Sequence, residues 1–377
     1  MTKNKICFIR LNDELIFNRK LLDTLRNYFN EYELIVITIE NVLKRQPFII
    51  ALNWLITLAM YGFDIIRRIK NPRQSFWRTP FIFKHIRKIV SQNVREENYI
   101  FTFQAQSLFD CSTVGIPHFL YTDHTHLANL TYPKFDKRKL YSKKWIELEK
   151  EIYQHADIVF VWSTNILDSL VKQYSQPRNR VVQVNVGSSI DINYFNIDPN
   201  KKFSKNILFV GSDWKRKGGP DLMIAFNKVL IKHPDAFLTI AGSSPKIRHP
   251  RCSVLGPLPV EKLKPLYEKA DIFCMPTLLE PFGIVYLEAM AAGLPVIGTR
   301  LGATQDFIKD GWNGLIVESG NIDQIEHALI SLLDNPDKCK IFGIRGMQIV
   351  KDQYTWDVVG KNIRNYILEL INPPNLA

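Results

Sequence analysis

Short runs of apolar and β-branched residues alternate along the chain with segments in which apolar residues recur every three or four positions. The first pattern is typical of buried parallel strands and the second of helices that cover them. In the first half, the runs that predict strands are KICFIR, ELIVITI, YIFTF, HFLYT and DIVFVW. In the second half, they are NILFVG, FLTIAG, CSVLG, DIFCMP, PVIGT and GLIV.

Two successive sets of such units predict an α/β protein with two doubly wound, Rossmann-like domains. The length of 377 residues agrees, because one core rarely grows beyond about 300 residues. We expect an N-terminal domain over 1–195, a second domain over 196–355 and a final helix, in 356–377, that packs back on the first domain. The polar stretch 191–206 is the expected hinge. Ligands of such folds bind at the carboxyl ends of the strands, so the cleft between the domains is the expected site.

A cationic loop follows the first predicted strand of the second half. Gly211 ends that strand, and Lys215, Arg216 and Lys217 then precede two glycines. Pro220 suits the first turn of the next helix. Cations in such a loop neutralise a diphosphate, and glycines let backbone N–H groups approach it. Taken alone, the loop is equally consistent with a solvated surface turn.

Two glutamates lie in PTLLEPFGIVYLEAMAAGLPVIGT, which predicts a loop and then a helix that ends at a glycine. Glu280 lies in the loop, and Glu288 follows eight residues later inside the helix. The helix start offers N–H groups and a positive dipole end to a phosphate, and Gly283 allows close approach. Taken singly, each glutamate is better explained by a structural role, Glu280 as a cap of the neighbouring helix and Glu288 as an exposed helix residue. The joint pattern favours a nucleotide site in which Glu288 accepts hydrogen bonds from ribose hydroxyls.

A histidine-containing segment, PHFLYTDHTHLAN, follows a predicted strand of the first half. It places Asp123, His124 and His126 at the strand end, where a ligand is expected. In an extended segment His124 and His126 point to one face, which permits a metal pair, but no third ligand is evident. Ordinary loop histidines are the alternative. Since no Asp-x-Asp motif occurs in the sequence, we expect no catalytic metal.

In these motifs the sequence resembles the family 4 retaining glycosyltransferases. FVGSDWKRKGG, LEPFGIVYLEAMAAGLPVIGT and GATQDFIKDGWNGLIV occur in the family's order, and the family's hallmark is two glutamates separated by seven residues. The resemblance covers roughly residues 206–356 and weakens towards the N-terminus. It implies the GT-B architecture, in which two Rossmann-like domains face each other across a cleft. The N-terminal domain would then be the acceptor side, and the second domain would bind a nucleotide sugar.

The resemblance also implies roles for single residues. Cations of the loop would hold the diphosphate, Glu288 would bind the ribose and Glu280 would contact the transferred sugar. His124, with Asp123 beside it, would lie near the reacting sugar. The remaining donor-binding positions would be Gly211, Lys215, Arg216, Lys217, Pro281, Phe282, Gly283 and Ile284. The sequence departs from the family at Ser212, where many relatives carry arginine, so which cation takes that role stays open. A second departure is that no glycine-rich turn follows the first strand.

The activity that the resemblance implies is retaining transfer of a hexose-type sugar from a nucleotide-diphosphate donor to a hydroxyl acceptor, without a cofactor. A lipid-linked or polysaccharide acceptor would suit the basic N-terminal half. In the family's favoured mechanism, the acceptor attacks from the face that the leaving phosphate vacates. Two alternatives stay open: a sugar-nucleotide epimerase of the same architecture, and a non-catalytic nucleotide-sugar-binding subunit.

The net charge of +12 comes mostly from residues 1–195, which hold 27 Lys and Arg against 18 Asp and Glu. Between Lys44 and Lys88, ten basic residues accompany one acid, Asp64. The same window contains PFIIALNWLITLAMYGFDII, which is as long as a membrane span. A buried helix is the favoured interpretation, ahead of a lipid-facing amphipathic element and a transmembrane helix. No motif indicates nucleic acid as a partner.

Five scattered cysteines without metal-ligand spacing predict buried, reduced thiols. The first residues, MTKNKICFIR, lack the apolar stretch of a signal peptide. We therefore expect a cytoplasmic protein, with a peripheral position at the inner face of a membrane if its basic half binds anionic lipid.

Overall fold

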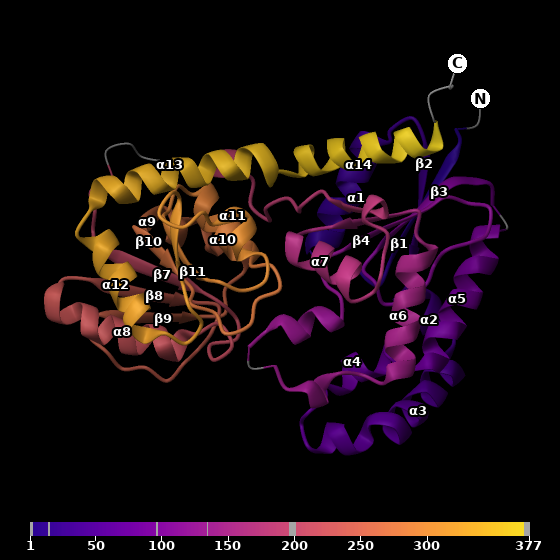
Figure 1. Cartoon of the computed structure of the whole chain (residues 1–377), viewed down its shortest axis with the longest axis horizontal. Helices are drawn as coiled ribbons and strands as arrows, with labels where there is room; N and C mark the ends of the chain where they lie inside the picture. Colours follow the sequence, from indigo (N-terminus) through magenta and orange to yellow (C-terminus); the bar gives the residue numbers. More distant parts are fainter. Residues whose placement is uncertain (1–2, 14–15, 96, 134, 196–200, 373–377) are drawn as a thin grey trace. The chain divides into compact units, whose positions relative to one another are not determined.

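The computed structural model describes residues 3–13, 16–95, 97–133, 135–195 and 201–372. Its contacts divide the chain into two compact units (Figure 1). Unit 1 comprises the described residues of Met1–Asn185 and Val359–Ala377, and unit 2 comprises those of Val186–Val358. The first boundary, between Asn185 and Val186, lies ten residues before the expected one and precedes the whole expected hinge, of which residues 196–200 lie outside the described residues.

Unit 1 is built on a six-stranded parallel sheet with the strand order β2-β1-β3-β4-β5-β6. The first five strands in chain order coincide with the predicted runs. The three-residue β6 has no counterpart among them, because a run as short as VVQ gives no recognisable pattern. The strands are β1 (Lys5–Arg10), β2 (Glu33–Thr38), β3 (Tyr99–Ala105), β4 (His118–Thr122), β5 (Ile158–Val161) and β6 (Val181–Gln183).

Four helices follow one another between β2 and β3, where a single crossover helix would suffice (Figure 1). Two serines set the starts of later helices: Ser142 caps α6 through the amide of Trp145, and Ser163 caps α7 through the amide of Ile166. The helices of this unit are α1 (Ile16–Tyr28), α2 (Ile39–Lys44), α3 (Pro47–Ile66), α4 (Pro72–Phe76), α5 (Pro80–Arg95), α6 (Lys143–His155) and α7 (Thr164–Lys172).

The last helix, α14 (Trp356–Ile371), contributes its residues from Val359 onward to unit 1. Arg364 donates to the carbonyl oxygen of Tyr28 and forms an ion pair with Glu31 at 2.6 Å. Gly360 permits the close approach to α1, because a Cβ at this position would overlap the ring of Tyr28. This part of α14 therefore packs against α1.

Unit 2 is built on a second parallel sheet, with the strand order β12-β11-β10-β7-β8-β9. All six strands coincide with predicted runs. They are β7 (Asn206–Val210), β8 (Phe237–Ala241), β9 (Cys252–Gly256), β10 (Ile272–Cys274), β11 (Val296–Thr299) and β12 (Gly314–Val317). The helices are α8 (Gly219–Lys232), α9 (Lys264–Lys269), α10 (Ile284–Ala291), α11 (Thr304–Phe307), α12 (Ile322–Leu333) and α13 (Pro336–Gln353).

The five cysteines are unbridged, and four of them are buried. Burial raises the pKa of the Cys7 thiol to about 12, and it raises that of the half-buried Cys252 to about 11. Both thiols therefore stay protonated at neutral pH, as the sequence leads one to expect of structural cysteines.

Helix α3 contradicts the buried helix that the sequence favours for residues 47–66. Among the described residues it is the one helix with the length and hydropathy of a membrane span, yet only 17% of its apolar window is buried. Its buried side chains are Asn53, Thr57 and Tyr61, whereas Phe48 and Ile66 are more than 80% exposed. The prediction failed because the hydropathy of a helix does not show which of its faces packs against the protein. In α3 the polar face packs against the protein and the apolar face is exposed.

Candidate active site

In unit 2, the loops that follow β7 and β10 lie side by side, because these two strands are neighbours in the sheet. The amide of Leu278 donates to the carbonyl oxygen of Arg216 at 2.8 Å, and the hydroxyl of Thr277 donates to the same oxygen at 3.1 Å. Gly218 has a φ of 75°, and a Cβ there would overlap the carbonyl oxygen of Pro276. The cationic loop and the glutamate loop are therefore joined through their backbones.

Across this junction Lys217 forms an ion pair with Glu280. The two side chains are only 12% and 6% exposed. Gly302 permits the burial of Glu280, because a Cβ there would overlap the carbonyl oxygen of Glu280. The structure thus brings together two residues that the sequence separates by more than sixty positions.

The three cations of the loop have different surroundings. Lys217 points to Glu280, whereas the guanidinium of Arg216 donates to the carbonyl oxygen of Leu279 at 2.9 Å. Arg216 also pairs loosely with Asp213, at 3.5 Å. Lys215 is exposed. The predicted Gly211 donates its amide to the carbonyl oxygen of Ala241 at 3.0 Å, which extends the sheet.

Helix α10 starts directly beside Glu280. Its N-cap, Gly283, has a φ of 93°, a conformation that side chains rarely adopt. Phe282 is buried with its ring 5.6 Å from that of Phe307, and Pro281 accepts a hydrogen bond from the amide of Ala303 at 3.1 Å. Ile284 is the first residue of the helix, so its N–H has no partner within the helix. We call Lys217, Glu280 and the first turn of α10 the lysine–glutamate site.

Glu288 lies further along α10, and it is 4% exposed rather than solvated. The hydroxyl of Tyr267 donates to its carboxylate at 2.8 Å, and Ser189 forms a second hydrogen bond. Burial outweighs these bonds and raises the pKa of Glu288 to about 7. A ligand that hydrogen-bonds to the Glu288 carboxyl group would thus have to displace Tyr267 and Ser189 from it.

In unit 1, the carboxyl ends of β3 and β4 open on a cavity of about 140 Å³. It contains both predicted catalytic residues of this unit, Asp123 and His124. We call it the histidine cavity. It is lined by Arg78, Gln106, Ser107, Leu108, Thr122, Asp123, His124, His126, Trp145 and Glu149.

Four polar atoms of the residues that line the histidine cavity are buried and have no hydrogen-bond partner: His124 Nδ1, Gln106 Oε1, Arg78 Nε and Trp145 Nε1. Asn129 Nδ2 donates to the carbonyl oxygen of His126 at 2.9 Å and lies 3.0 Å from His124 Nε2. This fixes His124 Nε2 as an acceptor and places the ring proton on Nδ1. Burial, together with the charge of Arg78, lowers the pKa of His124 to about 4, so the ring is neutral at pH 7. Unpaired buried groups of this kind are costly in a protein interior and call for a ligand or water.

Asp123 is half-buried beside His124, and burial raises the pKa of its carboxyl group. Arg78 is held over the rings of Tyr141 and Trp145, at 4.9 and 5.2 Å. Gln106 has a φ of 72°, which a residue other than glycine adopts only under constraint. The cavity thus offers a cation, a neutral imidazole donor and an amide acceptor in a small volume.

His126 has a different role from the one that the metal-pair hypothesis gives it. Its Nε2 accepts a hydrogen bond from the amide of Tyr141 at 2.9 Å, and its own amide donates to Glu149 at 2.9 Å. Burial lowers the pKa of this ring to about 3. His126 therefore holds the loop together as a neutral residue, and Nε2 is engaged. Among the described residues, no group of three or more His, Cys, Asp or Glu side chains is arranged to hold a metal ion.

Glu149, on α6, is the centre of a buried network. It accepts hydrogen bonds from the hydroxyls of Tyr153, at 3.2 Å, and Tyr174. Burial nevertheless raises its pKa to about 7. The sequence analysis missed this residue, although a signal exists: it lies four residues from both Trp145 and Tyr153 on the apolar face of its helix.

For the other two residues that the sequence analysis missed, Gln106 and Arg78, the sequence gives a weaker signal. Gln106 lies three residues after the end of the run YIFTF at residue 103, and it directly follows the observed strand β3, at the strand end where ligand-binding residues of such sheets lie. Arg78 lies in the short link between α4 and α5, one cation among ten in its window, and nothing in the sequence distinguishes it.

Residues 192–348 match the family model described as "Glycosyl transferases group 1". An uncharacterised glycosyltransferase of Methanocaldococcus jannaschii is 35% identical over 173 residues, which are 43% of this chain and 44% of that protein. The GDP-mannose-dependent monoacylated alpha-(1-6)-phosphatidylinositol monomannoside mannosyltransferase of Corynebacterium glutamicum is 33% identical over 168 residues, 40% of this chain and 44% of that protein. The matched parts thus cover less than half of each of these relatives.

Among solved structures, that of Anabaena HepE in complex with UDP and glucose aligns with 97% of this chain and 99% of its own, with a TM-score of 0.65 and 14% identity. At this identity the likeness concerns the fold. It agrees with the two parallel sheets and confirms the predicted GT-B architecture of two Rossmann-like domains.

Proposed function

Because residues 192–348 form a domain of the glycosyl transferases group 1 family on a GT-B fold, we propose that this protein is a family 4 retaining hexosyltransferase. It takes a sugar from a nucleotide-diphosphate donor to a hydroxyl acceptor, without a metal or other cofactor. The observation that carries the proposal is the buried pair of Lys217 and Glu280 beside the amino end of α10. That arrangement supplies positive charge for a diphosphate and a carboxylate for a sugar.

In this proposal the diphosphate lies against the first turn of α10. The helix dipole and the N–H groups from Phe282 to Ile284 stabilise its charge, and the ammonium of Lys217 neutralises it. Lys217 rather than Lys215 takes this role because it is held at the site by Glu280. Arg216 supports the loop by its bond to the carbonyl oxygen of Leu279.

The two glutamates act on different parts of the donor. Glu280, next to the first turn of α10, accepts a hydrogen bond from a hydroxyl of the transferred sugar. Glu288 accepts hydrogen bonds from the ribose, in exchange for those from Tyr267 and Ser189. Acidic residues take the same role towards ribose in other Rossmann-like sites.

The histidine cavity serves the reacting sugar and the acceptor. His124 donates from Nδ1 and Gln106 accepts at Oε1, so that a pair of hydroxyls satisfies both orphaned atoms. Asp123, whose carboxyl pKa is raised by burial, contacts the acceptor hydroxyl. Arg78 draws in an acceptor that carries negative charge.

The proposed reaction is a same-face displacement at the anomeric carbon. The bond from this carbon to the diphosphate oxygen breaks as the bond to the acceptor oxygen forms, and the acceptor proton passes to the departing diphosphate. Lys217 and the α10 dipole stabilise the charge that develops on the leaving group, which is where preorganised charge has its largest effect. Configuration is retained because the acceptor enters on the face that the diphosphate leaves.

The test begins with the purified protein and a panel of UDP-, GDP- and ADP-sugars in a thermal-shift assay. A true donor at one hundred times its dissociation constant adds roughly 2.7 kcal/mol to the stability of the folded state. The panel includes GDP-mannose, which the corynebacterial relative uses by its name, and UDP-glucose, whose components are bound in the Anabaena structure.

The donor that binds is then supplied with candidate hydroxyl acceptors, and the anomeric configuration of the product is read by NMR. Retained configuration in the product supports the proposal. An inverted product refutes the retaining mechanism, and an epimerised donor in the absence of acceptor refutes transfer. Full biological function of Glu280→Ala and His124→Ala in the source organism would instead mean that the protein binds nucleotide sugars without catalysis.

A further inference from the structure

The outward face of α3 is an apolar surface that no described part of the chain covers. Eight of its large apolar side chains are at least 36% exposed, a concentration found on no other helix among the described residues. Monomeric soluble proteins rarely leave a contiguous apolar patch of this kind to water. These side chains are Phe48, Leu52, Trp54, Leu55, Leu58, Met60, Phe63 and Ile66.

The inward face of α3 is polar and forms hydrogen bonds with neighbouring segments of unit 1. Asn53 donates to the carbonyl oxygen of Phe76 at 2.8 Å and accepts from the hydroxyl of Thr79. Two turns further along, the hydroxyl of Tyr61 donates to the carbonyl oxygen of Arg78 at 2.9 Å. Because anchors at two separate turns fix the helix along the unit, α3 is held as a surface helix rather than as one free to cross a bilayer.

Cations surround this apolar face at both ends of the helix. Lys44 and Arg45 precede α3 and are exposed, and so are Arg67 and Arg68, which follow it. Asp64, the one acid of the window, is already paired with Lys70. An apolar strip between two exposed cationic ends is complementary to a surface with anionic headgroups above an apolar layer.

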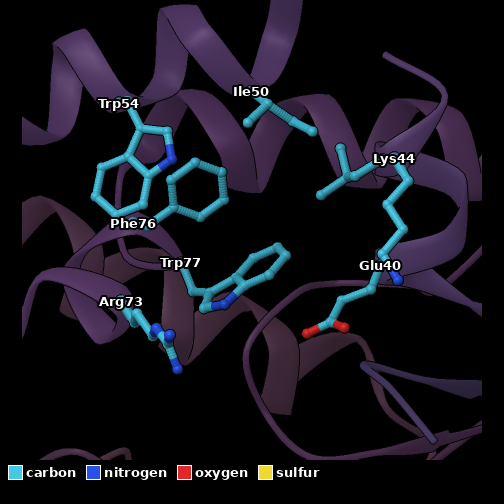
Figure 2. A pocket seen from close by; sticks show the side chains of 8 residues that line it. Glu40, Lys44, Ile50, Trp54, Arg73, Phe76 and Trp77 are labelled. Atoms are coloured by element: carbon cyan, nitrogen blue, oxygen red, sulfur yellow. The ribbon is translucent and has the colours of Figure 1, made fainter. Parts of the chain in front are cut away.

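A groove of about 260 Å³ opens between α2, α3 and α4 (Figure 2). Its wall includes the rings of Trp54 on α3, Phe76 on α4 and Trp77 just after α4, and the acid Glu40 on α2. The ring centroids of Trp54 and Phe76 are 4.9 Å apart, and those of Phe76 and Trp77 are 5.0 Å apart. Figure 2 shows Lys44 at one side of these rings and Arg73 at the other. Aromatic rings beside cations are typical of protein surfaces that lie at the headgroup level of a bilayer.

A second copy of this chain fits this surface poorly. In an isologous dimer through α3, whether the two helices run parallel or antiparallel, one cationic end meets another cationic end. Like charges in such close contact oppose association. Anionic lipid has the opposite charge at the same places.

We propose that α3 docks the protein on an anionic membrane, with its outward face in the boundary between headgroups and acyl chains. Docking bears on the proposed transferase through Tyr61, whose bond to Arg78 links α3 to the wall of the histidine cavity. An acceptor embedded in the same membrane would then meet Arg78 with its anionic headgroup. This last step rests on the proposed function, whereas the docking does not.

The experiment measures binding of the full chain to vesicles, without donor or acceptor, so its outcome is independent of the transferase activity. Co-sedimentation is compared on vesicles of phosphatidylcholine alone and of phosphatidylcholine with phosphatidylglycerol. Wild type should bind the anionic vesicles and detach as salt is raised. The double variant Leu55→Glu/Phe63→Glu should bind at least about tenfold more weakly, since both side chains are 66% exposed and would be withdrawn from the lipid.

The matched control is Ile231→Glu, because Ile231 is also an apolar residue near a helix end and is 86% exposed, but it lies on α8 of unit 2. It should bind vesicles as wild type does. Replacing the cations in Arg45→Gln/Arg67→Gln should weaken binding roughly fivefold per charge. Circular dichroism of each variant checks that the fold is kept.

Three results would overturn the proposal. One is the absence of binding to anionic vesicles by the folded wild type. Another is equal loss of binding in Ile231→Glu and in the double variant. The third is a stable dimer in light scattering that Leu55→Glu/Phe63→Glu dissociates, which would assign the apolar face to a second copy of the chain.

Discussion

The lysine–glutamate site of unit 2 and the histidine cavity of unit 1 differ in how their polar groups are satisfied. In unit 2, Lys217 and Glu280 neutralise each other, and Glu288 is bonded to Tyr267. In unit 1, His124 and Gln106 present buried atoms that have no partner. A ligand at the first site must exchange existing bonds for new ones, whereas a ligand at the second completes bonds that the protein leaves unmade.

This difference determines which substitutions should destabilise the folded protein more. A buried ion pair that loses one partner leaves an uncompensated charge, which is among the most expensive defects in a protein. Deletion of an unpaired hydrogen-bond donor leaves no partner group unsatisfied in the protein. Substitution of Lys217 or Glu280 should therefore affect both folding and activity, while substitution of His124 or Gln106 should affect mainly activity.

The largest effect is expected for Lys217→Ala. In the proposed mechanism it removes the charge that faces the leaving diphosphate, and it should therefore lower kcat/KM by about 10²- to 10³-fold. It also leaves Glu280 buried without its cation, so the melting temperature should fall. The control is Lys215→Ala, which removes an exposed cation two residues away and should change both quantities little. Equal losses in the two variants would contradict the assignment of the diphosphate to Lys217.

The second prediction uses the two buried glutamates, Glu149 in unit 1 and Glu288 in unit 2, whose pKa values are both raised to about 7. Because the folded pKa exceeds the unfolded value of about 4.5, this contribution to stability is fully present below pH 4.5 and is lost as the pH rises through 7. Relative to wild type, Glu149→Gln and Glu288→Gln should thus gain in unfolding free energy between pH 5 and pH 8, by up to about 3 kcal/mol each.

Melting curves of wild type and both variants at the two pH values check this. Comparison with wild type cancels the opposite contribution of the buried histidines, whose pKa values are lowered. If the difference between variant and wild type does not change with pH, the carboxyl in question is ionised throughout. If it changes in one unit only, the two glutamates have different environments after all.

The same contrast explains what could be predicted from the sequence. In unit 2 the residues predicted for the site lie within two short segments at the ends of neighbouring strands, so strand pattern and motif together point to the cationic loop, Glu280 and Glu288, although not to the one cation that pairs with Glu280. The fold followed from the same alternation, and all strands but the three-residue β6 were predicted. The choice among the three cations needed the structure, because the ion pair with Glu280 depends on how the two loops meet.

The histidine cavity could be predicted only in part, because its walls come from four distant segments. His124 and Asp123 follow β4, but Arg78 reaches the cavity through the chain of helices between β2 and β3. No periodicity in one segment reveals which of ten cations will stack on Trp145. The orientation of α3 escaped prediction for a similar reason: its outward face depends on Asn53 and Tyr61 finding partners in α4 and beyond.

A smaller effect is expected in the histidine cavity. His124→Ala deletes the Nδ1 donor, which should lower kcat about tenfold, the usual value of one hydrogen bond to a reacting group. The melting temperature should change little, because Nδ1 has no partner in the folded protein and Asn129 Nδ2, which faces Nε2, keeps its hydrogen bond to the carbonyl oxygen of His126. Asn129→Ala is the control: it removes the group that faces Nε2 and frees the tautomer, with a milder effect on kcat. A large drop in melting temperature for His124→Ala would place this residue among the structural ones.

The smallest effect is expected for Arg216, and it tests how the two loops of unit 2 cooperate. The guanidinium donates to the carbonyl oxygen of Leu279, next to Glu280, so Arg216→Ala should loosen the glutamate loop and raise the donor KM about three- to tenfold. Arg216→Lys can restore charge but not the directed bond. If charge towards the diphosphate were its role, the lysine variant would recover the donor KM. We expect no recovery, because in the structure this side chain is directed to a carbonyl oxygen of the loop, whereas Lys217 is the cation paired with Glu280.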